Sequence, residues 1–285
     1  MRHARIRTPL TRPAVVRGMD VHELGDGPPE VAVVGAIHGD EPCGARAIER
    51  LVAEDPDVER PVTLIVANEE ALADGSRYLE ADLNRSFPGD PDADAHEERL
   101  AHRLRSKLDG CTTLAIHSTQ SYAGPFAVID SVDEVARAVT PHLPVDAVIQ
   151  TDTFTEGRLI EHPHTLEVEA GLQGSPEAVD NAYWVTRAFL AATGVLAAPG
   201  SDTVVDAGGR EAVPVFRLRD RIPKPPAEEY EVFARNFERV ENGERFAAAD
   251  GEPVCADEPF YPVLLSAYGY RDQFGYVAER VGTLQ

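Results

Sequence analysis

The 285-residue sequence is poor in cysteine and has no long apolar run. Its three cysteines, Cys43, Cys111 and Cys255, show no paired spacing. A disulfide framework or a cysteine zinc site is therefore not expected. No run of eighteen apolar residues occurs, so we expect no transmembrane helix. The basic N-terminus has no apolar core of the kind found in signal peptides, which favours a cytoplasmic location.

Lysine is nearly absent, with Lys107 and Lys224 the only two among 27 basic residues. The 49 acidic residues bring the formal net charge to −22. Such a surface repels nucleic acid and anionic membranes, so neither is expected as a partner. An acidic surface with few lysines suits a cytoplasm at high salt, where charge repulsion is screened. We therefore hypothesise a halophilic source; the alternative is an acidic mesophilic protein.

Short apolar runs alternate with longer amphipathic segments along the first 200 residues. Six runs predict buried strands, because they are apolar on both faces and flanked by turn residues: 30–37, 62–67, 112–116, 126–130, 146–150 and 165–168. Three segments with helical periodicity lie between or after them: 43–54, 95–108 and 175–194. This rhythm predicts an α/β sheet covered by helices.

The composition and the pattern of apolar residues change near residue 200. The segment that follows is rich in turn residues, and the stretches 213–237 and 258–270 look like strands joined by loops. No strong helical pattern occurs after Gly194. We therefore place a boundary near residue 200, with a domain at 1–200 and a smaller β-rich C-terminal domain at 201–285.

Two of the predicted strands end in histidines. The segment "GAIHGDEPCG" places His38 and Glu41 after the strand at 30–37, and His117 follows the strand at 112–116. Open α/β sheets bind ligands beyond the carboxyl ends of their strands. Two histidines and a carboxylate leave the fourth position of a zinc ion open, which is the pattern of a catalytic site. The alternatives are a polar turn at a sheet edge and a hydrogen-bonded histidine.

Two further segments carry candidate polar groups. The stretch "SRYLEADLNRSFPGD" holds arginines and an asparagine that could bind carboxylates by forked hydrogen bonds; the alternative is a solvated, salt-bridged loop. The strand in "HPHTLEVEAGLQG" directs Glu167 and Glu169 to the same face. One of them could be a general base beside a metal; the alternative is an edge strand with an exposed face.

Taken together, "GAIHGDEPCG", "RYLEADLNRSF", "AIHSTQ" and "TLEVEAGLQG" resemble, in order and roughly in spacing, the succinylglutamate desuccinylase/aspartoacylase family. The segment "DLNRSFPG" is the most specific of the motifs. The resemblance covers about residues 30 to 200 and continues into "YEVFARNFERVENGE" and "FYPVLLSAYGY". It implies a zinc carboxypeptidase-like fold, with a mixed sheet flanked by helices and a smaller β-rich C-terminal domain that caps the site.

The resemblance also implies roles for individual residues. His38, Glu41 and His117 match the zinc ligands, and Glu167 matches the catalytic glutamate, whereas Glu169 matches no required acid. Arg77 matches an arginine that helps to polarise the scissile carbonyl. The remaining matches are to groups that bind the substrate: Asn84, Arg85, Arg158 (if one residue is deleted before Glu167) and Tyr268, with Tyr270 almost as good.

Two departures from the family pattern bear on these roles. Ala115 stands where most relatives have an aspartate, two residues before the third zinc ligand. Such an acid can orient a metal-binding histidine. A lysine found near the C-terminus of animal aspartoacylases is also missing, so the preferred acyl group stays open.

The sequence therefore predicts an amidohydrolase that holds one zinc ion per chain and deacylates a small N-acyl amino acid. A homo-oligomer is possible. Two alternatives remain: a metallocarboxypeptidase that acts on peptides, and a non-catalytic metal-binding protein whose tail mediates assembly.

Overall fold

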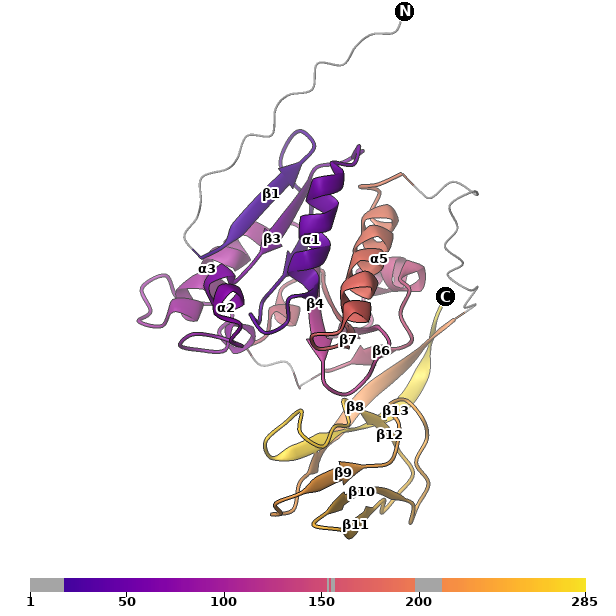
Figure 1. Ribbon diagram of the computed structural model, residues 1–285. Helices are drawn as coiled ribbons and strands as arrows, with labels where there is room; N and C mark the ends of the chain where they lie inside the picture. Colours follow the sequence, from indigo (N-terminus) through magenta and orange to yellow (C-terminus); the bar gives the residue numbers. More distant parts are fainter. Residues whose placement is uncertain (1–17, 153, 155–156, 198–211) are drawn as a thin grey trace, which may run out of the picture.

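A large mixed sheet forms the centre of the protein (Figure 1). The computed structural model describes residues 18–152, 154, 157–197 and 212–285. The sheet has ten strands, in the order β1-β3-β2-β4-β7-β5-β6-β8-β13-β12. Their bounds are β1 Asp20–Leu24, β2 Val31–Gly35, β3 Val62–Val66, β4 Thr112–Thr119, β5 Phe126–Ile129, β6 Val148–Gln150, β7 Thr165–Leu172, β8 Val213–Pro223, β12 Tyr261–Val263 and β13 Gln273–Leu284. A three-stranded sheet has the order β11-β10-β9 and comprises β9 Tyr230–Val232, β10 Arg245–Ala249 and β11 Glu252–Cys255.

Five α-helices and three short 3₁₀ helices occur in the described segments. The α-helices are α1 Cys43–Glu54, α2 Glu69–Asp74, α3 His96–Leu108, α4 Glu134–Val139 and α5 Pro176–Ala192; the 3₁₀ helices are η1 Leu83–Arg85, η2 Thr140–His142 and η3 Leu159–Glu161. None of these helices is long and apolar enough to span a bilayer.

The six strands expected in the first 200 residues are confirmed as β2 to β7. β2, β3, β4 and β7 run parallel, and every residue of β2 and β3 is buried. This burial explains their continuous apolar sequences, because the middle strands of such a sheet are covered on both faces. The edge strand β1, with the mixed sequence DVHEL, was not predicted; it pairs antiparallel with β3.

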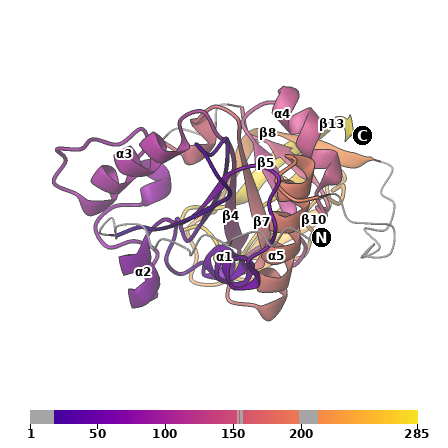
Figure 2. The same cartoon turned by 90° about the horizontal axis from the view of Figure 1, so that it is seen from above.

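The helices cover both faces of the sheet. Helices α1 and α5, both predicted, lie side by side (Figures 1 and 2). Alternating side chains of β2 divide between two apolar clusters: Val33 joins the cluster that contains Leu51 of α1, and Val34 joins the cluster that contains Leu104 of α3. The third predicted helix, α3, therefore packs on the opposite face from α1.

The C-terminal part is rich in strands, as expected. Residues 212–285 contain strands and no helix. Its long strand β8 pairs parallel with β6, and β13 pairs antiparallel with β8, so both strands extend the main sheet. The three small strands β9 to β11 lie at the far end of this part (Figure 1). The boundary predicted near residue 200 falls outside the described residues.

Candidate metal centre and active site

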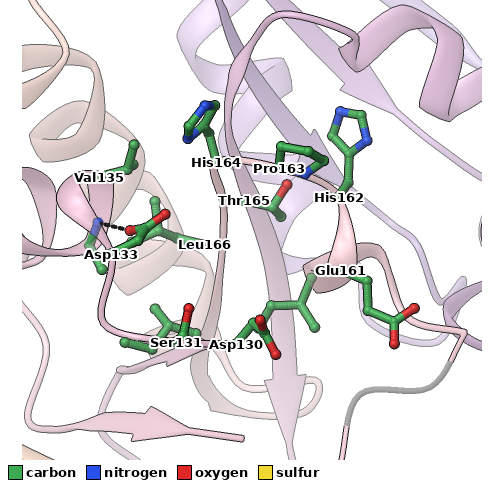
Figure 3. A pocket seen from close by; sticks show the side chains of 13 residues that line it. Asp130, Ser131, Asp133, Val135, Glu161, His162, Pro163, His164, Thr165 and Leu166 are labelled. Carbon is green, nitrogen blue, oxygen red and sulfur yellow. Dashed lines mark hydrogen bonds between the residues drawn. The ribbon is translucent and has the colours of Figure 1, made fainter. Parts of the chain in front are cut away.

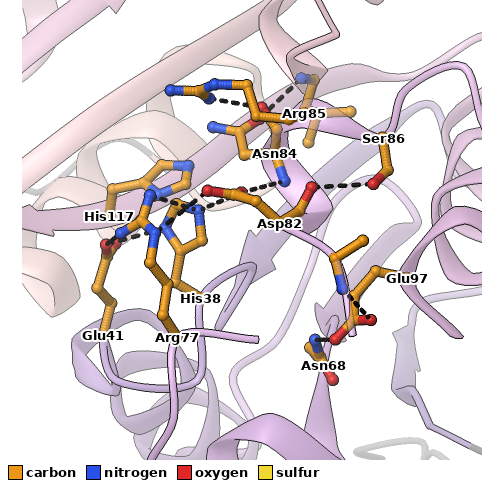
Figure 4. Close-up of polar contacts among 12 residues, drawn as sticks. His38, Glu41, Asn68, Arg77, Asp82, Asn84, Arg85, Ser86, Glu97 and His117 are labelled. Atoms are coloured by element: carbon orange, nitrogen blue, oxygen red, sulfur yellow. Dashed lines mark hydrogen bonds and ion pairs between the residues drawn. The ribbon is translucent and has the colours of Figure 1, made fainter. Parts of the chain in front are cut away.

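Two histidines and a glutamate converge where β2 and β4 end. His38, Glu41 and His117 are buried, and one potential ligand atom from each lies within 4.8 Å of the others. The His38 Nδ1 atom is 2.9 Å from Glu41 Oε1, and the His117 Nδ1 atom is 3.1 Å from Glu41 Oε2 (Figure 4). The Ser118 backbone N–H also donates to Glu41 Oε2, at 3.1 Å. The structure thus brings together the three residues predicted as metal ligands.

Close backbone packing fixes the turn that carries His38. A Cβ atom at Gly39 would lie 2.1 Å from the carbonyl carbon of Ala71, so only glycine fits there. The Gly39 N–H donates to the carbonyl of Arg77 at 3.1 Å. This contact ties the turn after β2 to the loop that follows α2, which carries the other charged groups.

The charges of the three residues support one another. Burial lowers the pKa of His38, but the Glu41 carboxylate and a hydrogen bond to Asp82 outweigh it and raise the pKa above its usual value. For His117, the hydrogen bond to Glu41 and the charge of Glu167 outweigh burial and raise the pKa to about 9. The two histidines hold the pKa of Glu41 well below its usual range, against the effect of burial. A carboxylate that stabilises positive charge beside two imidazoles is a donor set that fits a divalent metal.

The loop after α2 contacts His38 from its other side. Asp82 Oδ1 lies 3.1 Å from His38 Nε2. Arg77 donates through Nε to Asp82 Oδ2 at 3.2 Å and through Nη1 to Glu41 Oε1 at 3.1 Å. A carboxylate on the far nitrogen of a metal-binding histidine orients the ring. Asp82 belongs to the segment with the predicted arginines, but no role was predicted for it from the sequence.

A second carboxylate that sequence reasoning missed holds this loop. Glu97 of α3 is fully buried and accepts hydrogen bonds from the backbone N–H groups of Leu79, Glu80 and Ala81 at 2.7, 3.2 and 3.1 Å. The Asn68 side-chain amide donates a fourth, at 3.3 Å (Figure 4). The sequence contains an indication of this role. Glu97 stands three residues before Leu100, on the apolar face of the predicted helix, where a buried carboxylate needs hydrogen-bond partners.

The candidate base lies beside the metal ligands. Glu167 Oε1 is 3.9 Å from His117 Nε2 and accepts from Asn84 Nδ2 at 3.4 Å. The side-chain Oδ1 atom of Asn84 accepts from the Leu159 N–H at 2.9 Å. Both ends of the Asn84 amide therefore bond to protein groups, one of which is Glu167 itself.

The second glutamate of β7 is paired in register with His117. Burial, followed by the charge of Glu41, raises the pKa of Glu169 to about 7. Its Oε2 atom is buried without a hydrogen-bond partner among the described residues. Glu169 therefore shares the face of Glu167, as the alternation of the strand predicted, and the charges of Glu41, His117 and Glu167 act on it.

Two arginines lie near each other at the predicted substrate side. Partial burial and the neighbouring charge of Arg158 lower the pKa of Arg85. Arg85 donates to the carbonyl of Asn84 at 2.6 Å, and no described carboxylate lies within 4.0 Å of either guanidinium. The charges of Asp82 and Glu167 act on Arg85, but without an ion-pair contact in the described part of the chain both guanidinium groups are suited to binding an anion.

The structure places Tyr270, and not Tyr268, beside these arginines. Tyr268 is 66% exposed, and its hydroxyl accepts a hydrogen bond from the Tyr230 N–H. Burial, followed by the neighbouring Tyr276, raises the pKa of Tyr270, and the charges of Arg158, Glu169 and Arg85 also act on its hydroxyl. The prediction of Tyr268 as the tyrosine that reaches into the site therefore disagrees with the geometry. Tyr268 lies in a tight turn, in which its N–H donates to the Ser266 hydroxyl, and its side chain points outward.

A separate surface pocket contains none of the predicted site residues (Figure 3). It lies between the end of β5 and the start of β7 and is lined by Asp130, His164 and Thr165, among others. Because β5 and β7 are antiparallel, the end of β5 and the start of β7 share one edge of the sheet. This edge is opposite to the one that carries the metal ligands.

A mixed α/β sheet carries two histidines and a glutamate at its carboxyl edge, with a further glutamate beside them. This arrangement can hold a divalent metal next to an acid, as hydrolases require. Residues 28–130 match the family model described as "Succinylglutamate desuccinylase/Aspartoacylase catalytic domain". The resemblance predicted from the sequence is confirmed. The matched range contains the three candidate metal ligands, Arg77 and Arg85 but ends before Glu167.

Individual relatives agree with this match. An "N-acyl-aromatic-L-amino acid amidohydrolase (carboxylate-forming) B" from Danio rerio is 23% identical over 283 residues, covering 85% of this chain and 90% of the relative. A succinylglutamate desuccinylase/aspartoacylase from Rhodobacter sphaeroides has a similar structure, with a TM-score of 0.71, 23% identity and coverage of 92% and 89% of the two chains. Murine aminoacylase 3 gives a TM-score of 0.67, with 22% identity over 91% and 98%. These structures confirm the predicted fold.

Proposed function

We propose that this protein is a zinc-dependent amidohydrolase that removes the acyl group from an N-acyl amino acid. The observation that carries the proposal is the buried set of His38, Glu41 and His117, with Glu167 at 3.9 Å from His117. A purely structural metal site does not need an additional acid beside its ligands. The names of the relatives, which are amidohydrolases and desuccinylases, support the same reaction.

The donor set favours zinc over other divalent metals. Two imidazoles and one carboxylate are the protein ligands of several catalytic zinc sites, with one position left for a water or the substrate. When bound, zinc would polarise the acyl carbonyl and lower the pKa of a water molecule. His38, Glu41 and His117 would hold it.

Glu167 is the group that moves the proton. Its carboxylate takes a proton from the water that attacks the acyl carbon, and it passes that proton to the nitrogen as the C–N bond breaks. The products are a carboxylate and a free amino acid. Asn84 holds Glu167 Oε1 by its side-chain N–H, at 3.4 Å, and so restricts the directions in which the carboxylate can turn.

The arginines divide between the reacting carbonyl and the rest of the substrate. The guanidinium of Arg77 lies within 3.1 Å of Glu41 and stabilises negative charge that develops on the carbonyl oxygen. Arg85 and Arg158 bind a carboxylate of the substrate, because they carry two positive charges with no described acidic partner. Tyr270 takes the place proposed for Tyr268 and adds a hydroxyl to this group.

The test is a screen of N-acetyl- and N-succinyl-amino acids for release of free amine at high salt, with and without a chelator. We expect at least one substrate to be cleaved, and we expect the chelator to abolish and added zinc to restore the activity. Cleavage of C-terminal residues from peptides, with no turnover of acyl amino acids, would favour the metallocarboxypeptidase. Zinc binding without any turnover would favour the non-catalytic alternative.

A further inference from the structure

A lysine fixes the loop that brings Tyr270 to the substrate side. Lys224 follows β8 directly, and its ammonium donates a hydrogen bond of 2.6 Å to the carbonyl oxygen of Tyr270. Its backbone N–H donates to the carbonyl of Asp272 at 3.0 Å. The lysine therefore holds the backbone at two points that lie on either side of a single residue of this loop.

Three aromatic rings surround the same ammonium. The Lys224 Nζ atom is 4.8 Å from the ring centroid of Tyr230, 5.6 Å from that of Phe274 and 6.0 Å from that of Tyr268. A cation within about 6 Å of an aromatic face is attracted by the ring. The rings belong to β9, to β13 and to the loop itself, so one charge joins three parts of the C-terminal region.

The choice of lysine at this point is informative, because the chain uses arginine for all but two of its basic residues. An ammonium is compact and directs three donors from one atom, whereas a guanidinium is planar and presents its donors as a fork. The space between three rings and one carbonyl oxygen suits the compact group. Burial also lowers the pKa of Lys224, which agrees with an ammonium that has lost part of its water.

The side chain of Tyr270 is held at its other end by an aromatic contact. Its ring meets that of Tyr276 edge to face, with centroids 6.0 Å apart. The Tyr270 ring is therefore restrained by this contact and by the carbonyl that Lys224 binds. The neighbouring Gly269 lies against Gln120, three residues after His117, which places the loop at the edge of the sheet that carries the candidate ligands. The charges of Arg158 and Arg85 act on the Tyr270 hydroxyl from there. We propose that Lys224 is a positioning residue that acts on the substrate through Tyr270. This inference rests on the proposed function, because it assigns Tyr270 to the substrate.

The effect should appear in the affinity for substrate. Arg85, Arg158 and Tyr270 hold a part of the substrate that does not react, so their contacts are equal in the ground state and the transition state. Loss of such a contact raises KM and leaves kcat nearly unchanged. For Lys224→Met we expect KM to rise roughly 3- to 10-fold, the range that corresponds to one hydrogen bond.

The experiment compares Lys224→Met, Tyr270→Phe and the double variant, with Lys107→Met as the control for loss of a lysine on α3. We expect each single variant to raise KM, and we expect the double variant to raise it no further than the larger single effect, since coupled residues are not additive. Lys224→Arg should restore part of the affinity, because the charge over the rings is retained. Independent effects that multiply in the double variant would overturn the proposal.

Hydrogen exchange of the amides in residues 266–274 gives a readout that needs no activity. We expect faster exchange in Lys224→Met than in the wild type, and no change in Lys107→Met. If the wild type cleaves no acyl amino acid, the proposed function fails, and unchanged exchange in Lys224→Met would separately refute the positioning role. Faster exchange with an unchanged KM would show that the lysine orders the loop without serving the substrate, which also overturns the proposal.

Discussion

Replacing Glu97 by glutamine tests whether one buried carboxylate organises the loop beside the candidate metal site. Leu79 N–H and the Asn68 amide donate to Oε1, while Glu80 N–H and Ala81 N–H donate to Oε2. A glutamine keeps one acceptor oxygen but turns the other into an NH₂ group. In either orientation of the amide, two donors then face a donor, although the side chain keeps its shape.

The size of the effect follows from these four hydrogen bonds. A hydrogen bond to a charged group contributes about 1.5–3 kcal/mol, but the sum of four overstates the loss. Leu79 and Glu80 lie in an exposed stretch, and water can satisfy their N–H groups in the variant. We therefore expect the free energy of unfolding to fall by about 3 kcal/mol, within the range for breaking a buried charged network.

Urea titration at neutral pH would measure this change, and Glu98→Gln is the matched control. Glu98 is the neighbouring residue of α3, carries the same charge and is exposed, so its neutralisation should change the stability by less than about 0.5 kcal/mol. A Glu97→Gln protein as stable as the Glu98→Gln protein would refute the role assigned to Glu97.

The same variant makes a prediction about pH. Burial raises the pKa of Glu97, but the backbone hydrogen bonds from Leu79, Ala81 and Glu80 outweigh it and lower the pKa below its usual value of 4.5. A carboxyl whose folded pKa is depressed stabilises the protein above the unfolded value and loses this contribution as the pH falls through the folded pKa. The difference in the free energy of unfolding between wild type and Glu97→Gln should therefore have its largest value at pH 7 and should decrease below pH 4.5.

Three further predictions concern the site and the surface. Glu167→Gln should retain zinc, measured by metal analysis, yet lose turnover by roughly 10²-fold or more, whereas Glu169→Gln should lose much less; the reverse order would reassign the base. Arg85→Lys keeps the charge but loses the planar fork, so kcat/KM should fall on the order of 10-fold or more, and unchanged kinetics would remove Arg85 from the substrate. If the surface is adapted to high salt, the melting temperature should rise with KCl concentration well beyond the salt dependence of an ordinary acidic protein.

Most of the main sheet could be predicted because its strands are buried on both faces and their sequences are uniformly apolar. Strands such as β2 and β3 show this pattern without interruption. The edge strand β1 has a mixed pattern and could not be recognised in this way. Helices α2 and α4, with six residues each, are too short to show a helical period.

The site residues that could be predicted are those that lie at the ends of apolar strands. His38 and His117 come directly after or within apolar runs, and the order of parallel strands brings them together. Contacts set by loops were beyond the sequence. The choice between Tyr268 and Tyr270 depends on a turn around Ser266, and the role of Glu97 depends on three backbone groups sixteen to eighteen residues earlier.

The alanine at position 115 can be understood from the different supports of the two histidines. His38 lies in a turn beyond β2, where its ring is held by Asp82, and Asp82 belongs to the loop that Glu97 anchors. His117 lies within β4, in the middle of the sheet, between β2 and β7. Its Nε2 atom has no hydrogen-bond partner among the described residues, as the loss of the family aspartate would suggest.

A histidine in a central strand is oriented by the packing of its neighbours, because its backbone is paired on both sides and its side chain is buried. His38 is equally buried, but its backbone lies in a turn without strand pairing, so its orientation depends more on hydrogen bonds. At His38 the chain therefore keeps a carboxylate within hydrogen-bond distance of Nε2, at Asp82, whereas the carboxylate beside His117 Nε2 is Glu167 at 3.9 Å, beyond hydrogen-bond distance. The candidate metal site then depends more strongly on the loop of residues 77–85 than on the strand that carries Ala115. Glu97, remote from the candidate ligands, holds that loop, and its replacement therefore tests the support of the site.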